Sequence, residues 1–403
     1  MSGPLKGLKV LDLSRVLAGP WATQILADLG ADVIKVERPG AGDDTRGWGP
    51  PFLSGPNGEA GDAAYFLAAN RGKASVAIDI ADPRGADVVR RLAASADIFV
   101  ENFKVGALAR YGLDYSGIAA VKPDIVYCSI TGFGQDGPNA DKPGYDFVIQ
   151  AMSGLMSITG DANGQPTKVG VAICDITTGL YSAIAILAAI RHRDATGEGQ
   201  HIDMALFDTA LGWMANQAMN YLVSGTVPRA MGNAHPNIVP YQDFATATRR
   251  IAVAVGTDGQ FRAFARALGR EDWADHPHFA TSPARVANRA ALIAGIEAVL
   301  VGEPARHWLA VFDAAGIPAG PVNDLAEAFA EPQAEARGLV VEQPHPLAGT
   351  VRTMAQPMRF SQTPPDYRSA PPELGVDTSR VLRAAGLDAE TIAELAAAGV
   401  VEL

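Results

Sequence analysis

The first 135 residues alternate short apolar runs, rich in β-branched side chains, with longer amphipathic runs. A compact apolar run indicates a strand, and apolar positions three and four apart indicate a helix. On this basis we expect strands at residues 9–13, 32–36, 75–80, 97–100 and 124–130, and helices at 21–29, 83–94 and 115–121. Strands that alternate with helices predict a parallel, doubly wound sheet of the α/β class.

The rest of the chain follows a different pattern. Residues 145–224 are mostly helical in pattern, interrupted by the turn-rich stretch 161–166. Glycine, proline and asparagine then accumulate around 223–243, which indicates a linker. The expected elements of a smaller α+β domain are a strand at 250–255 and helices at 260–268, 284–300 and 305–314. A proline-rich connector at 361–372 leads to a helical tail at 378–398.

Composition narrows the classes of partner. The chain has 403 residues and a formal net charge of −11, without a run of Lys or Arg, so we expect no binding to nucleic acid or membrane. A polyanionic ligand remains open if a few basic residues converge locally. The two cysteines, Cys128 and Cys174, exclude a disulfide framework and fit a reducing compartment. The apolar stretch 180–190 is shorter than the roughly 20 residues that span a bilayer, and the N-terminus lacks a signal-peptide core. We therefore expect a cytoplasmic protein.

Several familiar motifs are incomplete or missing. Residues 132–137 match the G-x-G-x-x-G pattern after a strand, but the following residues continue a loop where a dinucleotide-binding fold needs a helix. His276 and His278 have no cluster of Cys or carboxylate residues at ligand spacing. The sequence also lacks the G-x-S-x-G and G-x-x-x-x-G-K-[ST] motifs. We expect neither a metal site nor a nicotinamide or flavin cofactor.

Candidate chemistry concentrates at 170–179, where Cys174 and Asp175 lie side by side at the start of a long apolar helix. A reactive thiolate usually has a histidine or another cationic neighbour, and no histidine lies nearby in sequence, which favours a packing role for Cys174. Asp is a favoured N-cap whose charge the helix dipole stabilises, so the local residues favour a capping role for Asp175. A nucleophilic role stays open and is compatible with capping, because a carboxylate held ionised at a helix N-terminus is available for attack.

Several longer stretches resemble one family. They are 5–20, beginning Leu-Lys-Gly-Leu-Lys-Val-Leu-Asp-Leu-Ser-Arg, and 30–39, 100–103, 129–134 and 197–203. Over essentially its whole length the chain is similar to class III CoA-transferases, the family of formyl-CoA transferase, carnitine CoA-transferase and α-methylacyl-CoA racemase. The resemblance implies a Rossmann-like large domain that forms an interlocked homodimer, with acyl-CoA as substrate and no cofactor bound permanently. The implied boundaries are a large domain at 1–205, completed by 365–403, a small α+β domain at 225–330, and linkers at 206–224 and 331–364.

The resemblance also implies a mechanism. The aspartate at position 175 attacks the acyl-CoA thioester, giving a mixed anhydride and then an aspartyl-CoA thioester that an acceptor carboxylate resolves. Backbone N–H groups of a glycine-bearing turn at 231–235 are the candidate stabilisers of the oxyanions. The positions implied to contact CoA are Val16, Arg38, Lys73, Asn102, Phe103, Arg110, Lys142 and Tyr145. The four basic residues would meet the phosphates and Phe103 would flank the adenine, although each basic residue taken alone reads as an ordinary surface charge.

Three hypotheses about activity follow: a CoA-transferase, an acyl-CoA racemase or isomerase, and a CoA-binding protein without catalysis. The racemase has a histidine as acid/base partner where this chain has Tyr145, and a tyrosine with an ordinary pKa near 10 is a poor general base at neutral pH. This favours the transferase.

One further position and two stretches of the sequence narrow the choice of acyl groups. Formyl-CoA transferase has a glutamine where this chain has Leu17, which argues against formate and oxalate. Residues 36–52 and 232–244 look closest to the subgroup that moves CoA between small dicarboxylates, with succinyl-CoA as donor and glutarate as acceptor. The distal carboxylate of such an acceptor needs a cationic or multi-donor anchor. The candidates for acceptor binding are Arg46, Trp48, Gly232, Asn233 and His235.

Overall fold

The computed structural model describes residues 3–403. Contacts within the chain divide it into two compact units, each built from separate stretches of sequence. The first unit comprises the chain up to Ser153, residues 169–219 and residues 337–403, and the second comprises residues 154–168 and 220–336. The domain boundaries that the family resemblance implies stay a prediction.

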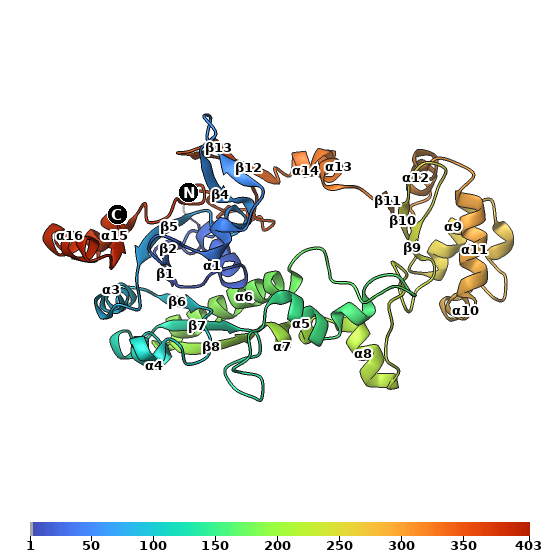
Figure 1. Cartoon of the computed structure of the whole chain (residues 1–403). Helices are drawn as coiled ribbons and strands as arrows, with labels where there is room; N and C mark the ends of the chain where they lie inside the picture. Colours follow the sequence, from blue (N-terminus) through green and yellow to red (C-terminus); the bar gives the residue numbers. More distant parts are fainter. Residues whose placement is uncertain (1–2) are drawn as a thin grey trace. The chain divides into compact units, whose positions relative to one another are not determined.

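The first unit is built on a seven-stranded sheet with the order β14-β5-β2-β1-β6-β7-β8 (Figure 1). Its strands are β1 (Lys9–Asp12), β2 (Asp32–Glu37), β5 (Lys73–Ile78), β6 (Ile98–Glu101), β7 (Val126–Thr131), β8 (Gln200–Ala205) and β14 (Val401–Glu402). All neighbouring strands are parallel except β14, which runs antiparallel to β5. Without β14 the order is the doubly wound 3-2-1-4-5-6, which reverses direction between β1 and β6. The predicted parallel α/β sheet is confirmed.

Helices cover both faces of this sheet. Those of the first unit are α1 (Ala18–Asp28), α2 (Ala64–Leu67), α3 (Pro83–Ala93), α4 (Tyr115–Val121), α5 (Asp146–Met152), α6 (Ile173–Thr196), α7 (Leu206–Gly212), α15 (Thr378–Ala384) and α16 (Ala389–Ala397), and α8 (Ala215–Ser224) crosses into the second unit. Helices α1 and α6 pack together on one face, where Ile25 and Leu29 meet Ala183. The other face carries α3, α4, α15 and α16 around a core that includes Leu11 and Phe99.

Helix α6 is long and apolar enough, with a mean hydropathy of 1.8, to cross a membrane by length and composition alone. In this fold it packs against α1, β7 and β8. Thr178 and Ser182 are fully buried on its inner face, while Leu180 and Ile184 are exposed. Within the unit, α6 therefore serves as a central packing helix that carries Asp175 at its start.

Some local expectations were wrong. Residues 39–63, for which no strand or helix was expected, contain the 3₁₀ turn η1 (Asp44–Gly47) and the hairpin β3 (Phe52–Ser54) and β4 (Ala60–Ala63). Strand β8 lies inside a segment expected to be mostly helical, because its pairing with β7 outweighs the local pattern. The expected tail helix is two helices, α15 and α16, separated by Gly386 in the left-handed region and the Asp388 N-cap.

The loop after β7 behaves as predicted, since no helix begins before α5 at Asp146. Gly132 and Gly144 close this loop, and a Cβ built on Gly132 would lie 2.5 Å from the Gly144 Cα. Two backbone segments can approach so closely only where side chains are missing. The glycines therefore shape a closed loop rather than a dinucleotide-binding turn.

The second unit has a three-stranded antiparallel sheet of β11 (Ala319–Pro321), β10 (Ile251–Ala254) and β9 (Tyr241–Phe244). Its helices are α9 (Asp258–Ala267), α10 (Ser282–Ala287), α11 (Arg289–Leu300), α12 (Ala305–Ala314), α13 (Leu325–Ala330) and α14 (Pro332–Ala336). The single helix expected at 284–300 is broken at Asn288. A core that includes Phe261, Phe264 and Phe312 joins α9 and α12 to the sheet. The chain then returns to the first unit through the hairpin β12 (Val340–His345) and β13 (Gly349–Met354).

Candidate active site

Asp175 lies in the first turn of α6, at the third residue of the helix. The N-cap position belongs to Ala172, which provides no side-chain hydrogen bond. Instead Asp146, the first residue of α5, accepts the backbone N–H of Cys174 at 2.8 Å and that of Asp175 at 3.3 Å through Oδ1. The capping role expected for Asp175 is therefore wrong, because a neighbouring helix supplies the acceptor that the free N–H groups need. The Asp175 carboxylate is left available.

The electrostatic setting of Asp175 also differs from the expectation. Burial, with a further contribution from the Asp146 charge, raises the pKa of the Asp175 carboxyl to about 7. Within the described residues the side-chain oxygens of Asp175 have no hydrogen-bond partner that would lower this pKa again. The helix dipole does not hold Asp175 fully ionised, so both protonation states are populated near neutral pH. A carboxylate of this basicity is a stronger nucleophile than an ordinary Asp.

Cys174 is fully buried beside it. Burial, together with the charges of Asp146 and Asp175, raises the pKa of the Cys174 thiol to about 12. A thiol with this pKa holds almost no thiolate at neutral pH, and thiolate is the reactive form. The predicted packing role of Cys174 is confirmed.

A groove of about 190 Å³ opens at the carboxyl ends of β1 and β6 and contains Asp175. This is the point where the strand order reverses, and open α/β sheets bind ligands at such a point. Six of the predicted site residues line this groove: Val16, Asn102, Phe103, Lys142, Tyr145 and Asp175. The groove also receives Ala18, the first residue of α1, whose N–H and that of Gly19 have no acceptor among residues 3–403. The topology therefore gathers residues that are far apart in sequence around one carboxylate.

A second hollow of about 260 Å³ adjoins the groove, and Phe103 and Arg15 line both. Arg38 and Arg110, two further predicted residues, line this hollow and are exposed. Neither guanidinium forms an ion pair within the part of the chain that the structure describes, although Arg110 stacks on Tyr111 at 4.6 Å. Unpaired guanidinium groups are suited to phosphate oxygens. The two hollows together present a carboxylate at one end and two cations at the other.

Comparisons with known proteins identify this arrangement. Residues 5–378 match the family described as CoA-transferase family III. The chain belongs to this family. Its enzyme class is therefore family III CoA-transferase, with an acyl-CoA as substrate.

Relatives of known name support the assignment over nearly the whole chain. The chain is 50% identical to a succinate–glutarate CoA-transferase of Agrobacterium fabrum over 379 residues, which are 94% of this chain and 95% of that protein. It is 43% identical to a succinyl-CoA:glutarate CoA-transferase of Homo sapiens over 400 residues, covering 99% of this chain and 90% of that protein. A crystal structure of a CAIB/BAIF family protein from Brucella suis aligns with a TM-score of 0.85 at 50% identity, covering 96% of this chain and all of that one.

Lys73 of this CoA-transferase lies outside both hollows. Its ammonium is fully buried and donates to Asp12 at 3.1 Å, to the Pro20 carbonyl at 3.0 Å and to Asn70 at 2.9 Å. Burial lowers the pKa of Lys73 to about 8, against the opposing effect of Asp12. All three N–H groups are used inside the fold, so Lys73 cannot meet a phosphate in this structure. Its expected role as a CoA contact is withdrawn.

Arg46 is likewise committed to the fold. Its guanidinium pairs with both oxygens of Glu37, at 2.8 and 2.7 Å, and with Asp62 at 2.6 Å, and it stacks on Phe66 at 3.7 Å. The Pro372 carbonyl accepts a further hydrogen bond. The guanidinium is buried and uses four of its five N–H groups within the fold, so it is not placed to bind a substrate carboxylate. The hypothesis that Arg46 anchors the acceptor is therefore wrong.

Trp48 is exposed and packs edge-on against Tyr65, with ring centroids 5.4 Å apart. Burial raises the pKa of Tyr65, and the Asp175 and Asp146 charges act in the same direction. Tyr65 thus lies within electrostatic reach of Asp175, and sequence reasoning missed it. Its only local signal is an aromatic residue on the short helix α2, which does not distinguish it from a packing residue.

Gly232, Asn233 and His235 belong to the second unit, where they form the turn before β9. Gly232 donates its N–H to the Gly160 carbonyl at 2.9 Å with φ +62°, and Asn233 donates to Asp243 at 2.9 Å. Burial and the Arg289 charge lower the pKa of His235, which favours its neutral form. Their contact with substrate stays a prediction. Arg289, which donates to the carbonyls of His235 and Pro236, is a cation beside this turn that the sequence did not reveal.

Proposed function

We propose that this family III CoA-transferase moves coenzyme A from succinyl-CoA to glutarate through covalent intermediates on Asp175. The observation that carries the proposal is the Asp175 carboxylate, which faces a groove at the reversal point of the sheet without a partner among the described residues. The names of relatives at 43–50% identity support the choice of substrates.

The chemistry requires only carboxylates and thiolates. An Asp175 oxygen attacks the thioester carbonyl, the C–S bond breaks, and CoA leaves as a thiolate from a succinyl–aspartyl anhydride. The thiolate then attacks the Asp175 carbonyl carbon and the anhydride C–O bond breaks. Succinate departs, and an aspartyl-CoA thioester remains on the enzyme. Glutarate repeats the two exchanges in reverse, which gives glutaryl-CoA and restores the Asp175 carboxylate. The cycle consumes no net proton.

Developing negative charge on the carbonyl oxygen needs donors. The N–H groups of Ala18 and Gly19, at the start of α1 on the same groove, support a site for this oxyanion. The turn at Met231–His235 is the second candidate, as the sequence suggested. Donors fixed before the reaction stabilise the transition state without a reorganisation cost.

Binding of CoA would extend from Asp175 along the two adjoining hollows. Arg38, Arg110 and Lys142 would hold its phosphates, and Phe103, which lines both hollows, would flank the adenine. His235 and Asn233 remain the candidates for the distal carboxylate of glutarate. Trp48 and Gly232 would complete the acceptor site.

The racemase or isomerase alternative is less well supported. It requires a second group able to exchange a Cα proton, at the position of Tyr145. Tyr145 lines the groove and is 64% exposed, and a phenol is a poor general base at neutral pH.

We also propose that the enzyme is a cytoplasmic homodimer. Exposed apolar side chains on two helices of the first unit support an interface: Phe147, Val148 and Met152 on α5, and Leu180, Tyr181 and Ile184 on α6. Helices α5 and α6 are neighbours, and large apolar side chains gathered on one surface are typical of an interface with another chain.

The test is a trapping experiment with the purified enzyme. Incubation with succinyl-CoA followed by borohydride or hydroxylamine should modify Asp175, located by mass spectrometry, and Asp175→Ala should show no modification. Addition of glutarate should discharge the intermediate and yield glutaryl-CoA. A modification at another residue would overturn the assignment of the nucleophile. Deuterium incorporation at Cα in D₂O without an acceptor acid would favour the racemase instead.

A further inference from the structure

The short loop between β1 and α1 is held almost entirely by side chains from elsewhere in the fold. The Ser14 N–H donates to Asp12 at 2.9 Å, and the Ser14 carbonyl accepts from the Lys35 ammonium at 2.8 Å. Asn102 accepts the Arg15 N–H at 3.0 Å and donates to the Arg15 carbonyl at 2.7 Å. A loop normally leaves such groups to water, so this one is built to keep a single conformation.

The loop ends in a strained residue. Val16 has φ +71°, in the left-handed region that β-branched residues avoid. Its N–H donates to both oxygens of Asp43, at 3.2 Å each. A residue keeps such a backbone conformation only where its surroundings enforce it, and such residues cluster at functional sites. Asp43 is the group that enforces it here.

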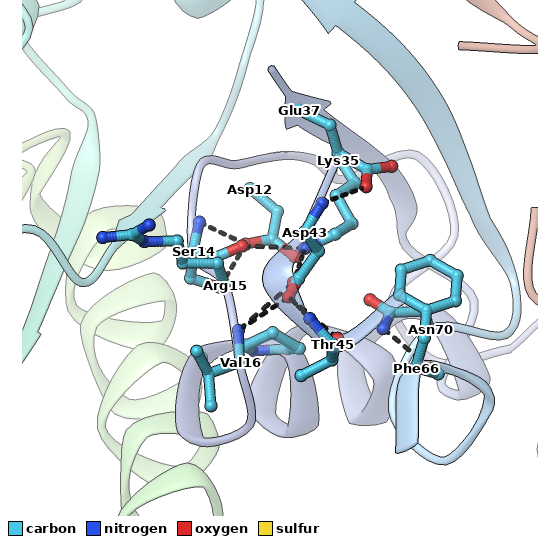
Figure 2. Close-up of polar contacts among 12 residues, drawn as sticks. Asp12, Ser14, Arg15, Val16, Lys35, Glu37, Asp43, Thr45, Phe66 and Asn70 are labelled. Carbon is cyan, nitrogen blue, oxygen red and sulfur yellow. Dashed lines mark hydrogen bonds and ion pairs between the residues drawn. The ribbon is translucent and has the colours of Figure 1, made fainter. Parts of the chain in front are cut away.

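Asp43 is itself fixed by a buried ion pair, as Figure 2 shows. The Lys35 ammonium donates to Asp43 at 2.9 Å, and both side chains are essentially inaccessible to water. The Thr45 N–H and hydroxyl donate to the other Asp43 oxygen at 3.0 and 2.8 Å. Burial alone would lower the pKa of Lys35, but the Asp43, Asp12 and Glu37 carboxylates raise it above its usual range. Burial would likewise raise the pKa of Asp43, but Lys35 and Thr45 hold it below its usual range. The pair therefore stays charged.

The loop that this pair fixes leads directly into the groove. Val16, Leu17 and Ala18 all line the groove that contains Asp175, whereas Lys35 and Asp43 lie in the wall of the adjoining hollow. Leu17 is the N-cap of α1, so the Val16 backbone sets where the first N–H groups of α1 point. Replacing a buried ion pair by apolar residues is often neutral for stability, so stability alone gives no reason to keep this one.

We propose that Lys35 and Asp43 are positioning residues for transfer: they hold Val16 in the left-handed region and thereby aim the start of α1 at the carbonyl attacked by Asp175. The inference rests on the proposed function of the groove. It assigns to the pair an effect on the rate of the chemical step that is separate from its effect on folding.

The test compares Asp43→Asn with the double variant Asp43→Asn/Val16→Gly. In Asp43→Asn the single-turnover rate of adduct formation at Asp175 should fall about tenfold or more at saturating succinyl-CoA. Misplaced N–H groups at the start of α1 would slow the chemical step without weakening the binding of succinyl-CoA. The KM for succinyl-CoA should change less, by about threefold at most, because Arg38 and Arg110 are untouched. Glycine adopts φ +71° without enforcement, so Val16→Gly should recover about threefold or more of the lost rate in the Asp43→Asn background. In the wild-type background it should bring no gain.

The matched control is Asp28→Asn, which breaks another buried carboxylate–cation pair, with Arg71 at 2.6 and 2.8 Å, away from the groove. Asp28→Asn should lower the free energy of unfolding. Any loss in the rate of adduct formation that it causes should not be recovered by Val16→Gly. The proposal is overturned if Asp43→Asn forms the adduct at the wild-type rate, if Val16→Gly recovers nothing, or if Asp28→Asn gives the same loss and recovery.

Two further outcomes are covered by the same design. If Asp43→Asn does not fold, Thr45→Ala removes one Asp43 donor and leaves the ion pair; it should show a smaller rate loss that Val16→Gly again recovers, and no loss overturns the proposal. If the wild-type enzyme forms no adduct at Asp175, the proposed function fails and this inference fails with it.

Discussion

The Asp146 carboxylate accepts the backbone N–H of Asp175 at 3.3 Å and that of Cys174 at 2.8 Å, so one acidic residue caps the helix on which another is presented. The Asp146 side chain is braced in turn by Gln150, which donates to its second oxygen at 2.6 Å. This relationship places a negative charge beside Asp175 and, with burial, raises its pKa to about 7. It gives the first prediction.

Asp146→Asn should move the pH dependence of adduct formation to lower pH. Wild-type kcat/KM for succinyl-CoA should rise with pH through about 7 as Asp175 ionises. The amide keeps an acceptor for the α6 N–H groups but removes the charge, so the midpoint should fall by about half a unit to one unit. Asp141→Asn, an exposed carboxylate in the loop after β7, serves as control. An unchanged midpoint would show that Asp146 does not set the ionisation of Asp175.

Asp175→Asn should stabilise the fold at high pH. The folded-state pKa of Asp175 lies above its unfolded value, so wild-type stability is lost as pH rises from about 4 through 7. The amide has no such loss. The difference in the free energy of unfolding should therefore be small at pH 4 and reach on the order of 2–4 kcal/mol at pH 8. Urea unfolding at both pH values measures it; equal differences at the two values would contradict the raised pKa.

Arg46→Ala should reduce stability rather than acceptor selectivity. It leaves Glu37 buried without its bidentate partner, which costs about 3–5 kcal/mol. Because the Arg46 guanidinium is buried and held by Glu37 and Asp62, the ratio of KM values for glutarate and a monocarboxylic acid should stay unchanged. Arg46→Lys, which keeps the charge but loses the bidentate geometry, provides a milder variant if the alanine form does not fold. A selective rise in the glutarate KM would restore Arg46 to the acceptor site.

Arg38→Gln and Arg110→Gln should weaken binding of CoA esters. Each removes a guanidinium from the hollow beside Phe103, so the KM for succinyl-CoA should rise about tenfold with kcat within about threefold. The effect should shrink at high salt, because salt screens exposed charges. Arg84→Gln on α3, which breaks only an exposed pair with Asp82, should leave KM unchanged. A loss in kcat with unchanged KM would place the two arginines outside the phosphate site.

The alternation of strand and helix patterns over the first 135 residues was sufficient to predict the parallel sheet. The spacing of apolar residues and the turn residues between elements are local properties of the chain. The family resemblance led to Asp175. It also led to the exposed cations Arg38 and Arg110, which line the hollow beside the groove. Strand β8 escaped prediction because its pairing with β7 is a long-range contact. Tyr65 and Arg289 escaped because each gains its interest only from neighbours distant in sequence.

The sequence by itself determined the fold class and the parallel sheet, and its resemblance to a family pointed to Asp175 as the proposed nucleophile. The tertiary structure alone decided which charged residues remain available to a ligand. Lys73 was implied by the family pattern and Arg46 was a candidate for the acceptor site, yet both are buried and paired with carboxylates within the fold. The same holds for Asp175, whose pKa is raised by burial and by the charge of Asp146, a residue of another helix that also caps α6. Burial and pairing depend on contacts between distant segments, and a local pattern of residues carries no record of them.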